Sequence, residues 1–153
     1  MSEIRFYHLR TSTLETALPK ILEKAVGQGH RAVVVAGSVE RGAALDAILW
    51  TYEERSFLPH AAAPANGNDP FAADQPVWIT TRVENPNGAS LLVLLDGQTV
   101  DDPGAWKLVC EVFDGNDETA VAAARERWKA LKAQGHALAY WRQDDRGAWE
   151  KAG

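Results

Sequence analysis

The stretch that decides the fold reads Arg31-Ala32-Val33-Val34-Val35-Ala36-Gly37-Ser38. A continuous run of small and β-branched apolar residues is typical of a central strand in a parallel sheet, which is covered on both faces. Gly37 interrupts the run, and Ser38 is a residue type preferred at the N-cap of a helix. We therefore expect a helix with apolar positions at Ala43, Ala44, Ala47, Ile48 and Leu49. A strand followed at once by a helix is the building unit of layered α/β folds.

The same alternation precedes this stretch. Residues 3–9 alternate, with Ile4, Phe6 and His8 on one side, and this period predicts a strand. An amphipathic pattern after Thr13 predicts a helix that ends at Gly27–Gly29. Pro19 lies inside this pattern, so the helix is expected either to kink there or to start near Leu18.

The alternation also continues toward the end of the chain. Apolar runs predict strands at 77–81, 91–95 and 137–141, and Asp144-Asp145-Arg146-Gly147 predicts a hairpin turn toward Trp149. The chain of 153 residues is expected to form one domain, residues 1–153. Together the patterns predict an α/β fold with a mixed, mainly parallel sheet and helices on both faces.

Two further segments complete the predicted order of elements. Residues 59–76 are rich in Ala, Pro, Gly and Asn, which predicts a long loop. Pro103 suits the first turn of a helix, and we expect that helix to run through Trp106, Val109, Cys110 and Phe113. A turn at 114–117 should then end it and cap a late helix that reaches about Gln134.

Composition excludes several classes of protein. The formal net charge is −5, which argues against a general nucleic-acid-coating surface but leaves a local basic patch open. We expect any DNA contact to be indirect. No apolar run approaches the length of a membrane span, and the first residues lack the layout of a secretion signal. The chain has one cysteine and therefore no intrachain disulfide, which fits a reducing cytoplasm.

A search for catalytic or cofactor-binding motifs gives little. The segment 37–42 follows a strand and opens a helix, but Ala43 and Ala44 stand where a phosphate loop needs Lys and then Ser or Thr. The four histidines show no metal-ligand spacing, and Asp96, Asp101 and Asp102 suit a turn at least as well as a metal. We expect no metal, no cofactor and no active site, and a nucleotide-binding α/β enzyme that uses the loops after the strands remains the alternative.

The late helix carries the most informative pattern. At about 100° per residue, its apolar stripe lies directly beside a basic stripe. The apolar stripe consists of Val121, Ala124, Trp128 and Leu131, and the basic stripe of Arg125, Lys129 and Lys132. A bulky aromatic beside converging cations can hold a ligand that is both apolar and anionic. Cations near the end of a helix also suit the helix dipole, so simple stabilisation is the competing interpretation.

The run 49–60 contains Leu49-Trp50 and then Ser56-Phe57-Leu58-Pro59-His60. Its aromatic residues either close the core or form an exposed patch for a partner. This run, with Gln75-Pro76-Val77, the opening 4–9 and the late segment 124–130, resembles the chi subunit of bacterial DNA polymerase III holoenzyme over nearly the whole chain. The resemblance implies a Rossmann-like α/β fold and a non-catalytic accessory subunit.

The resemblance also implies partners and site residues. Chi-like proteins connect the clamp-loader complex to single-stranded-DNA-binding protein by gripping the acidic C-terminal tail of that protein, and bind the psi subunit through another surface. The expected tail site consists of Arg125, Trp128, Lys129 and Lys132, with Phe113 as the pocket floor. The expected psi interface consists of Trp50, Phe57 and Leu58. In this chain Trp128 replaces the tyrosine of the family, and Val121 replaces a lysine of some members.

Overall fold

The computed structural model describes residues 3–51, 60–62, 73 and 75–152. Its helices are α1 (Leu14–Gly27), α2 (Val39–Thr51) and α3 (Glu118–Ala133), and a short 3-10 helix spans Pro103–Ala105. Its strands are β1 (Glu3–Leu9), β2 (Ala32–Val35), β3 (His60–Ala62), β4 (Val77–Thr80), β5 (Leu91–Leu94), β6 (Leu108–Asp114), β7 (Ala137–Gln143) and β8 (Trp149–Lys151).

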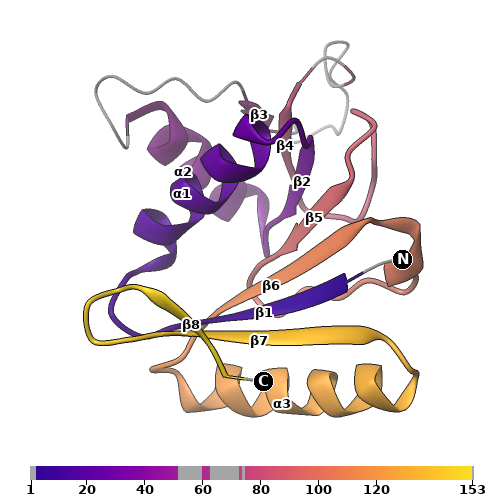
Figure 1. Cartoon of the computed structure of the whole chain (residues 1–153). Coiled ribbons are helices and arrows are strands. Elements are labelled where there is room, and N and C mark those ends of the chain that lie inside the picture. Colours follow the sequence, from indigo (N-terminus) through magenta and orange to yellow (C-terminus); the bar gives the residue numbers. More distant parts are fainter. Residues whose placement is uncertain (1–2, 52–59, 63–72, 74, 153) are drawn as a thin grey trace.

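The strands form one eight-stranded sheet in the order β3-β4-β2-β5-β6-β1-β7-β8 (Figure 1). Neighbouring strands run parallel throughout, except for the antiparallel pair β7–β8 at one edge. The prediction of a mixed, mainly parallel sheet is therefore confirmed. So is the predicted hairpin, which β7 and β8 form.

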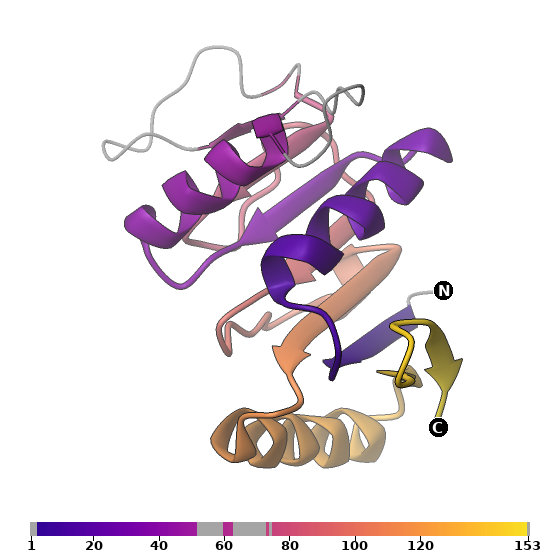
Figure 2. The same ribbon diagram turned by 90° about the vertical axis from the view of Figure 1, so that its left-hand side faces the viewer.

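Helices cover both faces of the sheet, as predicted. Figures 1 and 2 show α1 and α2 together on one side, whereas α3 lies against the β7 end on the other. Each face has its own buried core: Leu18, Leu22 and Leu45 pack on the α1–α2 side, and Phe6 and Ala124 on the α3 side. Every residue of β2 and β5 is buried, which explains why their sequences are apolar without alternation.

The first two helices begin close to their predicted starts. Helix α2 follows Ser38, whose side-chain oxygen accepts a hydrogen bond from the backbone N–H of Arg41 at 3.0 Å, as an N-cap does. Helix α1 starts at Leu14 directly after Thr13, with Pro19 inside it. The alternative start near Leu18 is therefore wrong.

The predicted helix from Pro103 through Phe113 is also wrong. Only one short turn, Pro103–Ala105, is helical, and residues 108–114 form β6, which lies between β5 and β1. Cys110, at the middle of this strand, is buried and pairs with Val93 on one side and Arg5 on the other. Cys110 thus belongs to the core, in a strand rather than in the predicted helix.

The predicted loop 59–76 needs one correction in its described part. His60–Ala62 forms β3, a three-residue edge strand that pairs in parallel with β4. A three-residue strand is too short to show the alternation of apolar and polar residues that distinguishes a strand from a loop. None of the helices in the described ranges is long and apolar enough to cross a membrane.

Candidate functional site

Helix α3 owes its position to strong signals at both ends. The Asp117 carboxylate caps the start by accepting from the N–H groups of Thr119 and Ala120 at 3.0 and 3.3 Å. Gly135 ends the helix in the left-handed region, with φ of 84°. The predicted span to about Gln134 is therefore confirmed within one residue.

The two predicted stripes of α3 face in different directions. Ala124 is buried against the sheet, and Val121, Trp128 and Leu131 pack around it, partly buried. The basic residues Arg125, Lys129 and Lys132 are exposed. Lys129 forms an exposed ion pair with Glu126 at 3.6 Å, whereas Arg125 has no ion pair within the described residues.

Trp128 belongs to an aromatic cluster that joins α3 to the sheet. Its ring meets Phe6 of β1 edge-on at 5.4 Å and Tyr140 of β7 at 5.7 Å between ring centres. Tyr140 also stacks on Phe6 at 6.4 Å and meets Phe113 of β6 at 6.2 Å. Tyr140 therefore connects Trp128 with Phe113, the two aromatic residues that the sequence analysis assigned to one pocket.

His8 completes this cluster at the carboxyl ends of the strands. Its Nδ1 shares a hydrogen bond with the Tyr140 hydroxyl at 2.6 Å, and its ring lies edge-on to Phe113 at 5.2 Å. A Cβ on Gly115 would lie 2.0 Å from the His8 ring, so only glycine leaves room for the imidazole. Burial, together with the positive charges of Arg142, Arg10 and Arg125, lowers the pKa of His8.

A buried ion pair fastens α3 to the sheet beside the aromatic cluster. Arg127 on α3 binds Glu111 on β6, and only 6% of the Glu111 side chain and 19% of the Arg127 side chain are exposed. Removal of the Glu111 carboxyl from water raises its pKa, and the Arg127 charge opposes that effect. The pair escapes prediction from the sequence, because Glu111 falls in the predicted helix and not in a predicted strand.

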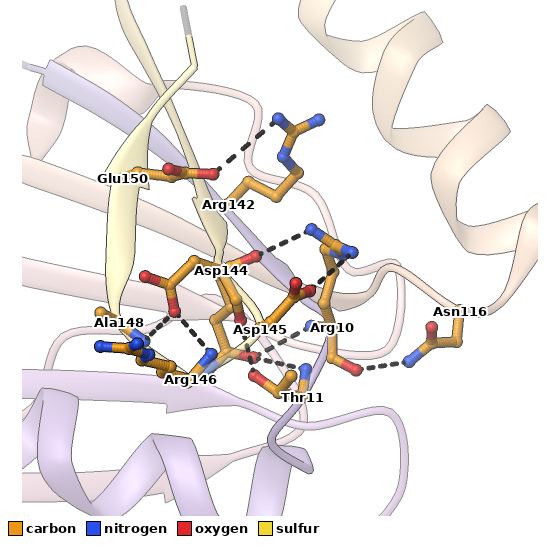
Figure 3. A network of polar contacts seen from close by, with 10 residues as sticks. Arg10, Thr11, Asn116, Arg142, Asp144, Asp145, Arg146, Ala148 and Glu150 are labelled. Carbon is orange, nitrogen blue, oxygen red and sulfur yellow. Dashed lines mark hydrogen bonds and ion pairs between the residues drawn. The ribbon is translucent and has the colours of Figure 1, made fainter.

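The hairpin β7–β8 holds the loop after β1 through a dense polar network (Figure 3). The buried Gln143 side chain accepts from the backbone N–H groups of Arg10, Thr11 and Ser12 at 2.9, 3.2 and 3.1 Å. The Arg10 guanidinium donates to the Gln143 carbonyl and to Asp145, both at 3.4 Å. The network fixes the loop after β1 next to β7, where Tyr140 and Arg142 stand.

A cavity of about 760 Å³ lies beyond the ends of β1 and β6. Its cations are largely engaged, since Arg41 pairs with Glu15 at 2.8 Å and Asp96 at 3.6 Å, and Arg127 binds Glu111. The Gly37 N–H, which a phosphate loop would offer to a nucleotide, donates to Asp96 at 2.9 Å. Together with Glu15 and Asp96, the carboxylates of Asp114 and Asp117 give the lining an excess of negative charge, which disfavours polyphosphates. No three His, Cys, Asp or Glu side chains gather as metal ligands in the described ranges.

The structure thus brings together most of the predicted tail-site residues. Arg125 and Trp128 lie within one turn of α3 above Tyr140, Lys129 lies beside them, and Lys132 lies in the last turn. Phe113 lies across Tyr140 on the sheet. The predicted psi interface cannot be placed, because Phe57, Leu58 and the Trp50 side chain lie outside the described residues.

Sequence reasoning missed the strand half of the site, namely His8, Tyr140, Arg142 and Arg10. These residues meet because β7 lies next to β1, a neighbour relation that no local pattern encodes. One local signal pointed to the strand half of the site. The polar residue His8 lies on the same side of the predicted strand as the apolar residues Ile4 and Phe6.

Comparisons with known proteins agree with this picture. The family model of the DNA polymerase III chi subunit, HolC, matches residues 1–139. The probable DNA polymerase III subunit chi of Rickettsia prowazekii (strain Madrid E) is 32% identical over 95 residues, which cover 62% of this chain and 55% of the relative. The chain therefore spans about half the length of the curated relative that it matches. Because the family model covers most of the sequence, including the whole of α3, the chain belongs to the family of DNA polymerase III chi subunits.

Proposed function

We propose that this protein is an accessory subunit of the DNA polymerase III holoenzyme, without an active site of its own. It connects the clamp-loader complex to single-stranded-DNA-binding protein by holding the C-terminal tail of that protein. Such a tail is acidic and ends in a phenylalanine that bears the free carboxylate. Family membership supports the replication role, and the chemistry of α3 supports the choice of ligand.

One observation carries the proposal: Arg125, which has no ion pair in the part of the chain that the structure describes, stands one turn from Trp128, whose ring packs on Tyr140. A guanidinium pairs with a carboxylate through two parallel hydrogen bonds. A half-buried indole offers a face for the phenylalanine ring of the same ligand, with ring centres at 4.5–7 Å as is usual for aromatic pairs. Phe113 lies further into this apolar wall.

Lys129 and Lys132 attract the acidic residues that precede the terminal phenylalanine. Both side chains are exposed, so their attraction is screened by salt over a length of about 8 Å at physiological ionic strength. Binding therefore has a salt-sensitive part from the lysines and a less sensitive part from Arg125 and the aromatic wall. Val121 replaces a cation found in some relatives, which reduces the salt-sensitive part.

The test is isothermal titration with a synthetic tail peptide. Removal of a charged hydrogen-bond partner costs about 1.5–3 kcal/mol, so Arg125→Ala should weaken binding roughly ten- to a hundredfold. Lys20→Ala is the matched control, because Lys20 is an exposed cation on α1, on the opposite face of the sheet. A peptide without its terminal phenylalanine should bind far more weakly than the complete one. Unchanged affinity in Arg125→Ala, or equal binding of the shortened peptide, would exclude the site.

We further propose that Trp50, Phe57 and Leu58 form the surface for a psi subunit where the organism has one. The support is the family, since Phe57, Leu58 and the Trp50 side chain lie outside the described part of the chain. Large aromatic residues dominate the binding energy of many interfaces. Phe57→Ala should abolish psi binding in a pull-down while the thermal melt stays unchanged. A melt that collapses instead would assign Phe57 to the core.

A further inference from the structure

Strand β7 adds a cation to the same face of the sheet as the aromatic cluster. In the β1–β7 register, Phe6 stands beside Tyr140 and His8 beside Arg142. Residues opposite one another in neighbouring strands point to the same face, and residues two apart in one strand do so as well. Because Phe6 and Tyr140 face α3, Arg142 faces α3 as well.

The positive charges of Arg142 and Arg125 act on the same groups. Both lower the pKa of His8, and both oppose the rise that burial causes in the pKa of Tyr140. This shared effect agrees with the β1–β7 register, which puts Arg142 beside His8, and with the packing of α3 on Tyr140 through Trp128. One cation comes from the helix and the other from the strand.

Neither cation is firmly committed to a partner within the protein. Among the described residues, Arg125 has no ion pair and Arg142 has one, with Glu150 of β8 at 4.0 Å. The Arg142 and Glu150 side chains are 46% and 55% exposed, so this pair contributes little. Figure 3 shows the Arg142 side chain extending toward Glu150. By contrast, the Arg10 guanidinium donates to Gln143 and Asp145.

We propose that Arg142 is the second carboxylate-binding residue of the tail site. The terminal carboxylate lies over Tyr140 between Arg125 and Arg142, and the phenylalanine ring packs on Trp128. In the free protein Arg142 is paired with Glu150, and the carboxylate of the ligand takes the place of Glu150. This inference rests on the proposed function, because it assumes that the α3 site takes an acidic tail ending in phenylalanine.

The two-sided arrangement explains how a free carboxyl terminus is distinguished from an internal phenylalanine. Only the terminal residue carries a second anionic group next to its ring, and two guanidinium groups give that group four donors in paired geometry. An amide in its place leaves both cations without a counter-charge. Recognition of the chain end therefore depends on both arginines, whereas the lysines of α3 respond to the acidity of the tail in general.

The experiment measures the Kd of an acidic peptide ending in phenylalanine, with either a free carboxylate or a carboxamide, by isothermal titration. Arg142→Ala should weaken binding of the carboxylate peptide about tenfold, as expected for loss of a charged hydrogen-bond partner. It should change binding of the carboxamide peptide by less than about twofold. This double-mutant cycle separates direct contact with the carboxylate from a general loss of positive charge. Arg142→Lys, which keeps the charge but not the paired donors, should fall in between.

Two further variants test the opposite effect, a gain in affinity, and provide a control. Glu150→Gln removes the competing counter-charge and should tighten binding of the carboxylate peptide a few-fold. Arg146→Ala removes an exposed cation from the turn of the same hairpin and should leave affinity unchanged. Figure 3 shows the Arg146 side chain on the far side of the turn from Arg142. Thermal melts of all variants should match the wild type.

The outcomes separate this inference from the proposed function. If the wild type does not bind the peptide, or Arg125→Ala binds as well as the wild type, the proposed function fails and the inference fails with it. If Arg125→Ala weakens binding but Arg142→Ala behaves like Arg146→Ala, the inference alone is overturned. Equal losses for the carboxylate and carboxamide peptides in Arg142→Ala would also overturn it.

Discussion

The ion pair between Arg127 and Glu111 makes a stability prediction that can be worked out from the structure. Arg127→Ala leaves a carboxylate of which only 6% is exposed on β6, beneath α3. Removal of one partner of a buried pair typically costs about 3–5 kcal/mol, and the 19% exposure of Arg127 favours the lower end. We therefore expect a loss of about 3 kcal/mol in the free energy of unfolding. For a chain of 153 residues this lowers the Tm by about 6–12 °C.

The same variant should respond to pH. Burial already raises the pKa of Glu111 in the folded protein, and loss of the Arg127 charge raises it further. The folded state then binds more protons than the unfolded chain above the ordinary carboxyl pKa, so stability falls as pH rises through the folded pKa. The free energy of unfolding that Arg127→Ala loses relative to the wild type should be larger at pH 8 than at pH 5.

Urea denaturation followed by far-UV circular dichroism, at several pH values, measures these effects. Lys129→Ala is the matched control on the same helix, because its pair with Glu126 is exposed and should contribute less than about 1 kcal/mol. Adding Glu111→Gln to Arg127→Ala should recover much of the loss, since it removes the unpaired charge. A deficit below 1 kcal/mol that does not change with pH would refute this reasoning.

Three further outcomes are expected. First, Gly115→Ala should lower the Tm, because the new Cβ would lie 2.0 Å from the His8 ring and 2.5 Å from the Leu9 carbonyl. Overpacking of this kind costs about 1–3 kcal/mol, and a Tm equal to that of the wild type would contradict the close packing. Second, a bound anion offsets the cations that lower the pKa of His8, so binding raises that pKa. The affinity for the tail peptide, measured by titration, should therefore increase from pH 7.5 to 5.5 in the wild type but not in His8→Gln. The groups that face His8 are Tyr140, Phe113, Arg10, Arg125, Arg142 and Asp114. Third, Asp117→Ala removes the cap of α3 and should cost about 1 kcal/mol in urea denaturation, whereas Asp145→Ala, an exposed change in the hairpin, should cost less than half of that.

Much of the fold could be predicted because its central strands and capped helices carry strong local signals. The run Val33–Val35 and the caps Ser38 and Asp117 each specify one element without reference to the rest of the chain. The segment 103–113 failed because two local rules competed. Pro103 does open a helical turn, but the turn ends after Ala105, and the sheet requires β6 as its bridge between β5 and β1.

The same difference between local signals and long-range contacts applies to the candidate site. Its helical half was predictable, because Arg125 and Trp128 share a helix and their relative position follows from its period. Its strand half was not, because Tyr140 and Arg142 reach α3 only through the order of strands across the sheet. Long-range strand order is a property of the whole chain, and single-sequence patterns report only on neighbours in the chain.

The position of Cys110 has a practical consequence. This thiol, the only one in the sequence, is 1% exposed in the middle of β6, and burial raises its pKa to about 12. Thiolates rather than thiols react with maleimide or iodoacetamide dyes, so the native protein should resist labelling. A cysteine introduced on the surface would therefore carry a fluorophore at a single known place without prior removal of the natural one. In the unaltered chain, slow labelling of Cys110 would report how often the centre of the sheet opens to solvent.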